Sequence, residues 1–301
     1  MHVQAGRVLE WIDRAGYACA AAWSTSYCVT AYVGNVHYDG NIGPGDVVEV
    51  DAKVIHTGSS SIHVLVSVHA RGLQESEFSR AMHCILVLVA VNEQGRPHRV
   101  RPWKPQSLED SARQKLALER IPVRTRIKDA MLAEQYSEEG TASRSTLRFV
   151  AGSDTANWAG NAHGGTVMRW IHEAAATCAV LCSPEGVHAT YSGGIHFHHP
   201  IRIGDIVEVD ARAILVNGRD IHISILVRSA PQQGPDKLSL TTRCMMIFTV
   251  DERQTVPTAI PEQTAEDRRL AAHAREIIRL RSELTRIGDH LLRAAKEHCQ
   301  E

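Results

Sequence analysis

Asp13 is a carboxylate inside an otherwise apolar segment that spans residues 6–22. A carboxylate in such an environment is destabilising unless it is paired or functional. Its sequence neighbour Arg14 would point about 100° away on a helix, so Arg14 is not an automatic partner. Asp13 is therefore a candidate for general acid–base or nucleophilic chemistry. The alternative is a structural aspartate that bonds a neighbouring backbone group, and both interpretations stay open at this point.

A second candidate group is the segment Asn161-Ala-His-Gly-Gly165, which precedes another apolar segment. Paired glycines let a second backbone or a ligand come close. The first N–H groups of a helix have no partner within the helix, and the helix dipole is positive there. Such a helix start can hold a developing oxyanion. The alternative is a tight turn in which Asn161 is an ordinary cap residue.

The two candidate groups lie in two copies of one repeated unit. Segment 8–15 matches 167–174, and segment 45–52 matches 204–211. The shorter match of Ile62-His63 with Ile221-His222 has the same spacing of 159 positions. Three matches at one spacing indicate a tandem duplication.

Each copy combines one apolar helix with strands of period 2. The helices are predicted over 6–22 and 165–181, and their apolar side chains lie nearly all round, which favours burial. The strands are predicted over 29–38, 47–56, 62–70 and 81–91, then over 190–198, 206–216, 221–229 and 239–250, with an extra strand, 145–151, before the second helix. One buried helix followed by an antiparallel meander predicts a curled sheet wrapped round a central helix.

The predicted fold class is α+β, with two such domains in tandem and a C-terminal helix. The expected boundaries are 1–104 for the first domain, 105–136 for a connector, 137–255 for the second domain and 256–301 for a linker and helix. The connector is polar and charged, and we expect one or two helical turns in it. The C-terminal helix carries a heptad seam at Leu270, His273, Ile277, Leu280, Leu284, Ile287, Leu291 and Ala294. This seam predicts either packing on the chain's own body or self-association.

The chain resembles the hotdog-fold acyl-CoA thioesterases, specifically the two-hotdog cytosolic acyl-CoA and acetyl-CoA hydrolases. Gly6-Arg-Val-Leu-Glu-Trp-Ile-Asp13 is similar to the family's Gly-x-Leu-Leu-x-Trp-Ile-Asp segment, and Cys28-Val-Thr-Ala31 is similar to its Cys-Val-Thr-Ala strand. Asn161-Ala-His-Gly-Gly165 is similar to its Asn-x-His-Gly-Gly element. The resemblance covers about residues 2–250. The first copy departs from it by lacking a leading strand and a Gly-Gly pair, the second copy lacks the Asp, and no lipid-binding domain follows.

The resemblance implies a tandem double hotdog that hydrolyses acyl-CoA to free fatty acid and CoA at one composite site. Asp13 would act as general base or as nucleophile, and sequence does not choose between the two. Asn161 would hold the attacking water or the carbonyl, and the Gly165 N–H would polarise the thioester carbonyl. The residues implied for substrate and CoA binding are Ala31, Tyr32, Val33, Ser60, Ser61, Ile62, Arg120, His163, Gly164, Thr190, Tyr191 and Ser192.

A mirror site is expected where the roles of the two copies are exchanged. His172 stands at the position that matches Asp13, with Glu173 beside it, and His2 stands at the position that matches Asn161. The carboxylate and the Asn/Gly-Gly helix start are thus divided between the copies. We therefore expect one site per chain and a degenerate mirror site.

The composition is that of a soluble globular protein, with 44% hydrophobic and 22% charged residues. Its 33 Lys+Arg and 34 Asp+Glu give a formal net charge of −1, which argues against nucleic acid as a partner. No apolar run approaches the roughly 20 residues that span a bilayer, and no leader segment is recognisable, so we expect a cytoplasmic protein. Seven scattered cysteines without a C-x-x-C pair predict reduced thiols.

The histidines do not predict a metal site. His196-Phe-His-His199 superficially suggests a ligand set, but no Cys or carboxylate completes a zinc site at the usual spacing. The sequence also has no Gly-rich nucleotide loop and no Gly-x-Ser-x-Gly elbow, which disfavours serine-hydrolase chemistry. We expect no metal and no cofactor other than the CoA thioester that is the substrate.

Two other functions stay open from sequence. A hotdog enoyl-CoA hydratase/dehydratase would use a His–carboxylate pair such as His172 and Glu173, although its Ser-Gly-Asp-x-Asn-Pro signature is absent. A non-catalytic acyl-CoA-binding module would assemble through the C-terminal helix. The expected partners are acyl-CoA and further copies of the chain, as a homo-oligomeric dimer, trimer or hexamer.

Overall fold

A computed structural model gives the fold and describes residues 2–38, 40–184, 186–260 and 262–297. The first copy contains α1 (Ala5–Ser24), β1 (Tyr27–Val33), β2 (Val36–Tyr38), β3 (Val47–Thr57), β4 (Ser61–Arg71) and β5 (Ser79–Val91). The second contains β6 (Arg144–Val150), a short 3-10 helix η1 (Ser153–Thr155), α3 (Gly164–Cys182), β7 (Val187–Phe197), β8 (Ile206–Asn217), β9 (Asp220–Ala230) and β10 (Ser239–Val250). Between and after the copies lie α2 (Leu108–Ala133) and α4 (Ala265–Glu297).

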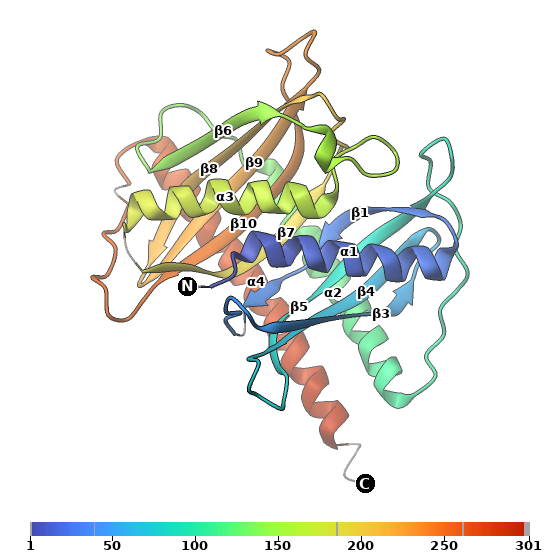
Figure 1. The fold of residues 1–301 in the computed structure, drawn as a ribbon. Helices are drawn as coiled ribbons and strands as arrows, with labels where there is room; N and C mark the ends of the chain where they lie inside the picture. The colour runs from blue at the N-terminus through green and yellow to red at the C-terminus, as the bar shows by residue number, and fades with distance from the viewer. Residues whose placement is uncertain (1, 39, 185, 261, 298–301) are drawn as a thin grey trace.

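The strands of both copies form one sheet rather than two separate ones. Its order is β3-β4-β5-β1-β7-β10-β9-β8-β6, and β2 pairs with β5 and β7. The copies join where β1 and β7 pair antiparallel, with Tyr32 opposite His196 and Val33 opposite Ile195. The expected tandem of two curled sheets, each on its central helix, is confirmed, and the two halves are continuous across this seam (Figure 1).

Helices α1 and α3 lie side by side on one face of the sheet (Figure 1). They run antiparallel, because Gly6 near the start of α1 faces His172 of α3, and Gly165 near the start of α3 faces Asp13 of α1. Fully buried side chains such as Leu9 of α1 form one hydrophobic core with the strands. The expectation of buried central helices is therefore confirmed.

Helices α2 and α4 cover the opposite face of the sheet (Figure 1). A second apolar cluster holds them there, formed by Val123, Ile127, Met131, Ile214, Met245, Leu270, Ala274, Ile277, Leu280 and Leu284. The described part of the heptad seam thus packs on the chain's own body, which removes it as a surface for self-association. The seam positions Leu291 and Ala294 lie outside the described side chains. Across the described residues, no helix combines the length and apolar character that crossing a membrane requires.

The expectation of one or two helical turns in the connector is wrong, because α2 is a helix of 26 residues. The Ser107 side chain caps its start by accepting a hydrogen bond from the Asp110 N–H at 3.0 Å. Only a narrow stripe of α2 is buried, including Ala117 and Val123. The many charged residues outside that stripe gave the segment the composition of a loop.

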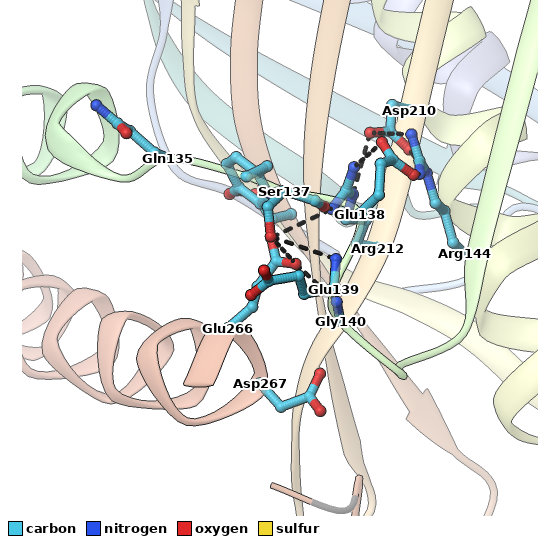
Figure 2. A network of polar contacts seen from close by, with 12 residues as sticks. Gln135, Ser137, Glu138, Glu139, Gly140, Arg144, Asp210, Arg212, Glu266 and Asp267 are labelled. Atoms are coloured by element: carbon cyan, nitrogen blue, oxygen red, sulfur yellow. Dashed lines mark hydrogen bonds and ion pairs between the residues drawn. The ribbon is translucent and has the colours of Figure 1, made fainter. Parts of the chain in front are cut away.

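The N-terminus of α4 is fixed by a buried polar network (Figure 2). Glu266 is fully buried and accepts hydrogen bonds from the Ser137 hydroxyl and the Gly140 N–H, both at 2.7 Å. Arg212, itself buried, lies 3.4 Å from Glu266 and 3.1 Å from Asp210. The network ties the start of α4 to the segment between α2 and β6.

Six cysteines are free thiols, namely Cys19, Cys28, Cys84, Cys178, Cys182 and Cys244. This confirms the expectation of reduced thiols for those six. Cys299 lies outside the described residues.

Candidate active site

The Asp13 side chain lies where the two central helices meet. It is buried, with 3% of its surface exposed. One carboxylate oxygen accepts a hydrogen bond from the Thr30 hydroxyl of β1 at 2.7 Å, and the other accepts one from the Gly165 N–H of α3 at 2.8 Å. The carboxylate of the first copy and the Gly-Gly helix start of the second are thus in direct contact.

Burial dominates the electrostatics of this carboxylate. It raises the pKa of Asp13 above the ordinary value of 3.8, while the hydrogen bonds from Thr30 and Gly165 and the charges of His163 and Arg14 act in the opposite direction. A raised pKa brings a carboxylate closer to the range in which it both accepts and releases a proton near neutral pH. Asp13 therefore has the character of a base rather than of a permanently ionised surface group.

The two glycines permit this approach of the helices. A Cβ on Gly165 would lie 2.9 Å from the Glu10 Cα and 2.9 Å from the Asp13 Cβ. A Cβ on Gly164 would lie 3.0 Å from an Asp13 carboxylate oxygen. Because the Glu10 Cα belongs to the backbone, a Cβ on Gly165 would force the helices apart, whereas a Cβ on Gly164 would require only small shifts of the Asp13 and Thr30 side chains. The closeness of α1 therefore requires glycine at position 165.

A pocket of about 350 Å³ opens onto the carboxylate. Its lining includes six residues that bear on the chemistry, Asp13, Thr30, Ala31, Asn161, His163 and Gly164. The side-chain amide of Asn161 has no hydrogen-bond partner among the described residues and lines this pocket. The structure thus brings Asp13, Asn161, His163, Gly164 and the predicted binding residue Ala31 to one place.

The expected role of the Gly165 N–H differs from what the structure shows. This N–H was expected to polarise the thioester carbonyl, but it donates to Asp13. Gly165 therefore positions the carboxylate. The Gly164 N–H, for which the described residues offer no acceptor, and the Asn161 side-chain amide are donors at the pocket that remain for a ligand.

Three predicted binding residues lie outside this pocket, near the other face of the sheet. Tyr32 and Arg120 line a separate small cavity together with Arg124, whose guanidinium lies 4.5 Å from the Tyr32 ring centre. Tyr191 is buried and packs under the Arg281 guanidinium of α4. A shift in strand register after Thr30 in β1, and the matching shift after Ala189 in β7, interrupt the alternation of side chains and turn these tyrosines away from the central helices. Their expected contact with the same ligand is therefore not supported by the geometry.

The other predicted binding residues have structural contacts. Val33 and Ile62 are fully buried in the hydrophobic core, so their side chains are not a surface for CoA. Ser192 is fully buried and shares a 2.7 Å hydrogen bond with the Tyr38 hydroxyl. The expected side-chain contacts of these three residues with CoA are corrected, because all three side chains are buried within the protein.

Thr190 lies within β7, and Ser60 and Ser61 lie at the start of β4. Thr190 shares a 2.8 Å hydrogen bond with Thr249 in the second copy. The turn between β3 and β4 contains Ser60, whose carbonyl accepts from the Ala90 N–H at 3.0 Å, and Ser61 begins β4. None of the three lines the pocket at Asp13.

The mirror position lacks the groups that surround Asp13. His172 is buried and stacks on Phe248 at 5.8 Å, and its Nδ1 has no hydrogen-bond partner among the described residues. Burial lowers the pKa of His172 to about 4, so the ring is neutral at physiological pH. His2 is exposed, and Glu173 pairs with Arg169 at 3.3 Å. Ala189 stands where the first copy has Thr30.

Sequence reasoning missed two contributors to the pocket. Thr30 lies in the Cys28-Val-Thr-Ala31 segment, and its role follows from its hydroxyl, which donates to the buried Asp13 carboxylate. Trp158 lines the pocket with 80% of its surface exposed, and its ring lies 5.5 Å from that of Tyr27. It sits in an irregular loop, which sequence periodicity does not place. Among the described residues, no group of three His, Cys, Asp or Glu could hold a metal ion.

A family model of the thioesterase superfamily matches residues 2–77 and 159–235, one stretch in each copy and together about half of the chain. The chain belongs to the thioesterase superfamily. The first match contains α1 with Asp13, and the second contains α3 with Gly165. The two sides of the site at Asp13 therefore come from two separately matched regions.

Relatives within the superfamily are longer than this chain. Acyl-coenzyme A thioesterase 11 of Mus musculus is 26% identical over 91% of this chain and 49% of its own length. Cytosolic acyl coenzyme A thioester hydrolase of Homo sapiens is 24% identical over 76% of this chain and 64% of its own length. The chain therefore spans about half to two-thirds of the length of these relatives.

A solved structure supports the fold. A Lactobacillus plantarum protein, provisionally described as an oleoyl thioesterase, has a TM-score of 0.57 to this chain at 10% identity. The match covers 83% of this chain and 90% of that one. At this identity the likeness concerns the arrangement of the helices and strands alone.

Proposed function

We propose that this chain is an acyl-CoA thioesterase that hydrolyses acyl-CoA to free fatty acid and CoA at one composite site per chain. The observation that carries the proposal is the buried Asp13 carboxylate, which contacts the Gly165 N–H at 2.8 Å at a pocket of about 350 Å³. A base, a helix N-terminus and an unpaired amide at one cavity are the parts that acyl transfer to water requires.

Asp13 is the general base in the proposed reaction. It takes a proton from a water molecule while the water oxygen attacks the thioester carbonyl carbon. The negative charge that forms on the carbonyl oxygen is held by the positive end of α3 and by the Asn161 amide. The carbon–sulfur bond then breaks, CoA leaves as the thiol after taking up the proton, and the fatty acid remains. Direct attack by Asp13 to give an anhydride uses the same groups.

Relatives support the choice of substrate. The names of the Mus musculus and Homo sapiens relatives include acyl-coenzyme A thioesterase and acyl coenzyme A thioester hydrolase. Acyl-CoA is therefore the substrate class that we propose for the pocket at Asp13. The reaction uses a carboxylate, an amide and water, so we propose that it needs no further cofactor.

We propose a cytoplasmic location and a homo-oligomeric state, as a dimer, trimer or hexamer. The word cytosolic in the name of the human relative supports the location. The described part of the α4 seam is used within the chain, so contacts between copies would involve other surfaces.

Release of free thiol from acyl-CoA substrates of graded chain length tests the proposal. We expect thiol release well above the rate without protein for at least one chain length. Tight CoA binding without thiol release would instead indicate an acyl-CoA-binding module, and hydration of an enoyl-CoA would indicate a hydratase. Either result would contradict the proposed hydrolysis.

A further inference from the structure

Three aromatic residues, Tyr17, Tyr27 and Trp158, form an aromatic wall along the pocket at Asp13. Tyr17 follows Asp13 by four residues on α1 and therefore lies on the same side of that helix. Its ring centre lies 5.9 Å from that of Tyr27, at the start of β1, in an edge-to-face arrangement. The Tyr27 ring lies in turn 5.5 Å from the Trp158 ring. The aromatic wall thus leads from the carboxylate outward to Trp158.

The turn that carries Trp158 is held by its own hydrogen bonds. The Asn157 N–H donates to the Asn161 carbonyl at 2.7 Å, and the Gly160 N–H donates to the Asn157 carbonyl at 3.0 Å. The Asn157 side-chain oxygen accepts from the Ala159 and Asn161 N–H groups at 2.9 and 3.1 Å. The Trp158 side chain is therefore presented to solvent from a defined turn at the pocket.

Packing of the fold does not account for the aromatic wall. Within the described ranges, the hydrophobic core includes neither Tyr27 nor Trp158, and Tyr17 packs only at its margin. The second copy has Ala176 and Gly186 at the positions that match Tyr17 and Tyr27. These rings therefore accompany the carboxylate of the first copy and are not part of the packing that the two copies share.

The remaining lining of the pocket indicates which part of a thioester lies on the aromatic wall. Glu93 lines the pocket from the turn after β5, and the last residue of β5 is paired with Tyr27. A carboxylate at this side repels the phosphates of CoA. His198 and His199, which follow β7, and Thr242 of β10 also line the pocket and offer polar groups to the amides of the pantetheine arm. The aromatic wall is therefore the better surface for the apolar acyl chain.

We propose that the aromatic wall binds the acyl chain and makes the chain selective for medium-length saturated acyl-CoA over acetyl-CoA. This inference rests on the proposed thioesterase function and names the substrate class of the same site. A methylene that leaves water for an apolar surface increases binding by up to about fourfold. The kcat/KM value therefore rises with each methylene that lies on Tyr17, Tyr27 or Trp158, and it levels off where the acyl chain passes Trp158 into solvent.

Thiol release from acetyl-, hexanoyl- and decanoyl-CoA measures the contribution of the aromatic wall. In the wild type, we expect kcat/KM to be at least about 30-fold higher for decanoyl-CoA than for acetyl-CoA. Trp158→Ala shortens the aromatic wall, so kcat/KM should fall about tenfold for decanoyl-CoA and stay within about twofold for acetyl-CoA. The change should appear in KM rather than in kcat, because the acyl chain is held equally in the ground state and in the transition state.

Two sets of variants serve as controls. Phe78→Ala removes an exposed aromatic ring that lies outside the pocket, under the Arg71 guanidinium, and should leave the chain-length profile unchanged. Tyr17→Phe keeps the ring and should keep the profile. Tyr17→Ala removes the ring and should abolish most of the difference between acetyl-CoA and hexanoyl-CoA. Circular dichroism verifies that all variants are folded.

Binding to the Asp13→Asn chain tests the aromatic wall without hydrolysis. Titration calorimetry gives the affinities of decanoyl-CoA and of free CoA for this chain and for the double variant that also carries Trp158→Ala. We expect the double variant to bind decanoyl-CoA about tenfold more weakly and to bind free CoA with unchanged affinity. This measurement does not depend on thiol release by the wild type.

Several outcomes would overturn the proposal. An equal loss of kcat/KM for acetyl-CoA and decanoyl-CoA in Trp158→Ala, or weaker binding of free CoA, would mean that Trp158 contacts the CoA portion instead of the acyl chain. An unchanged profile and an unchanged decanoyl-CoA affinity would equally contradict it. A wild type that releases no thiol, combined with the expected loss of decanoyl-CoA affinity, would contradict the thioesterase function alone and support the acyl-binding role of the aromatic wall.

Discussion

At the scale of single residues, the environment of Asp13 decides the proposed chemistry. Burial raises its pKa, and the Thr30 hydroxyl and the Gly165 N–H limit that rise by donating to the carboxylate. Because the folded-state pKa lies above 3.8, folding favours the protonated form, and ionisation of Asp13 lowers stability as pH rises through that pKa. The site therefore keeps a carboxylate that weakens the fold, which is a sign of function.

The pH profile of thiol release tests this environment. The rate is expected to fall on the acid side as pH drops through the raised pKa of Asp13, because the base must be ionised. Thr30→Val removes a hydrogen bond that favours the carboxylate, so the acid limb should move to higher pH. Thr190→Val, at a hydroxyl of β7 that bonds Thr249 and lies outside the pocket, is the control and should leave the limb in place. An unmoved limb in Thr30→Val would mean that another group sets it.

At the scale of elements, the contact between α1 and α3 positions the site. Gly165 lies against Asp13 and Glu10 of the facing helix. At the equivalent Gly6, an added Cβ would lie 3.0 Å from the His172 Cβ. The two contacts are related by the duplication, but only one of them holds a carboxylate. Substitutions at these two glycines therefore separate packing from catalysis.

Gly165→Ala and Gly6→Ala form a matched pair. Both are expected to lower the free energy of unfolding by about 1–3 kcal/mol, because each Cβ forces the helices apart. Gly165→Ala should also lower the rate of thiol release by about 100-fold, since it displaces Asp13, whereas Gly6→Ala should retain most of it. Denaturant unfolding and the thiol assay on the same preparations provide the two readouts. Equal loss of activity in both variants would contradict the assignment.

The polar network around Glu266 also acts at the scale of elements, because it holds the start of α4 in place. Glu266→Ala leaves Arg212, a mostly buried cation, without one of its partners (Figure 2). We expect a loss of about 3 kcal/mol in the free energy of unfolding, measured with denaturant. Glu276→Ala, in an exposed pair on the same helix, should have no measurable effect. A small change in Glu266→Ala would show that Asp210 alone is a sufficient partner for Arg212.

The same network predicts a pH dependence of stability. Burial acts to raise the pKa of Glu266, but hydrogen bonds from Ser137 and Gly140 outweigh it, and the pKa lies below 4.5. A depressed folded-state pKa contributes stability above pH 4.5 that is lost as pH falls through the lower value. The acid midpoint of unfolding should therefore move to higher pH in Glu266→Gln. A midpoint that stays in place would assign the acid transition to other carboxylates.

At the scale of the whole molecule, the duplication made most of the fold predictable. Helix and strand periodicities in two related copies identified both central helices and the strands, and the family resemblance implied that Asp13 meets the helix start at Gly165. The length of α2 was not predictable from composition, because its buried stripe is narrow. The donation of the Gly165 N–H to Asp13 and the burial of Ile62 and Ser192 depend on the distances between neighbouring strands and helices, which a single sequence does not specify.

The division of polar groups between the copies implies one site per chain. Asp13 has a hydroxyl and an N–H as partners, whereas His172 is neutral and its Nδ1 has no partner among the described residues. The central claim is that Asp13 of the first copy acts on a thioester held at the α3 start of the second copy.

The most direct test is thiol release by Asp13→Asn beside wild type and Glu173→Ala, at saturating acyl-CoA. Asparagine keeps the size of the side chain and an oxygen for the Gly165 N–H, so the fold should persist. We predict a fall of at least about 100-fold for Asp13→Asn and little change for Glu173→Ala. Full activity in Asp13→Asn, or a comparable loss in Glu173→Ala alone, would contradict the composite site.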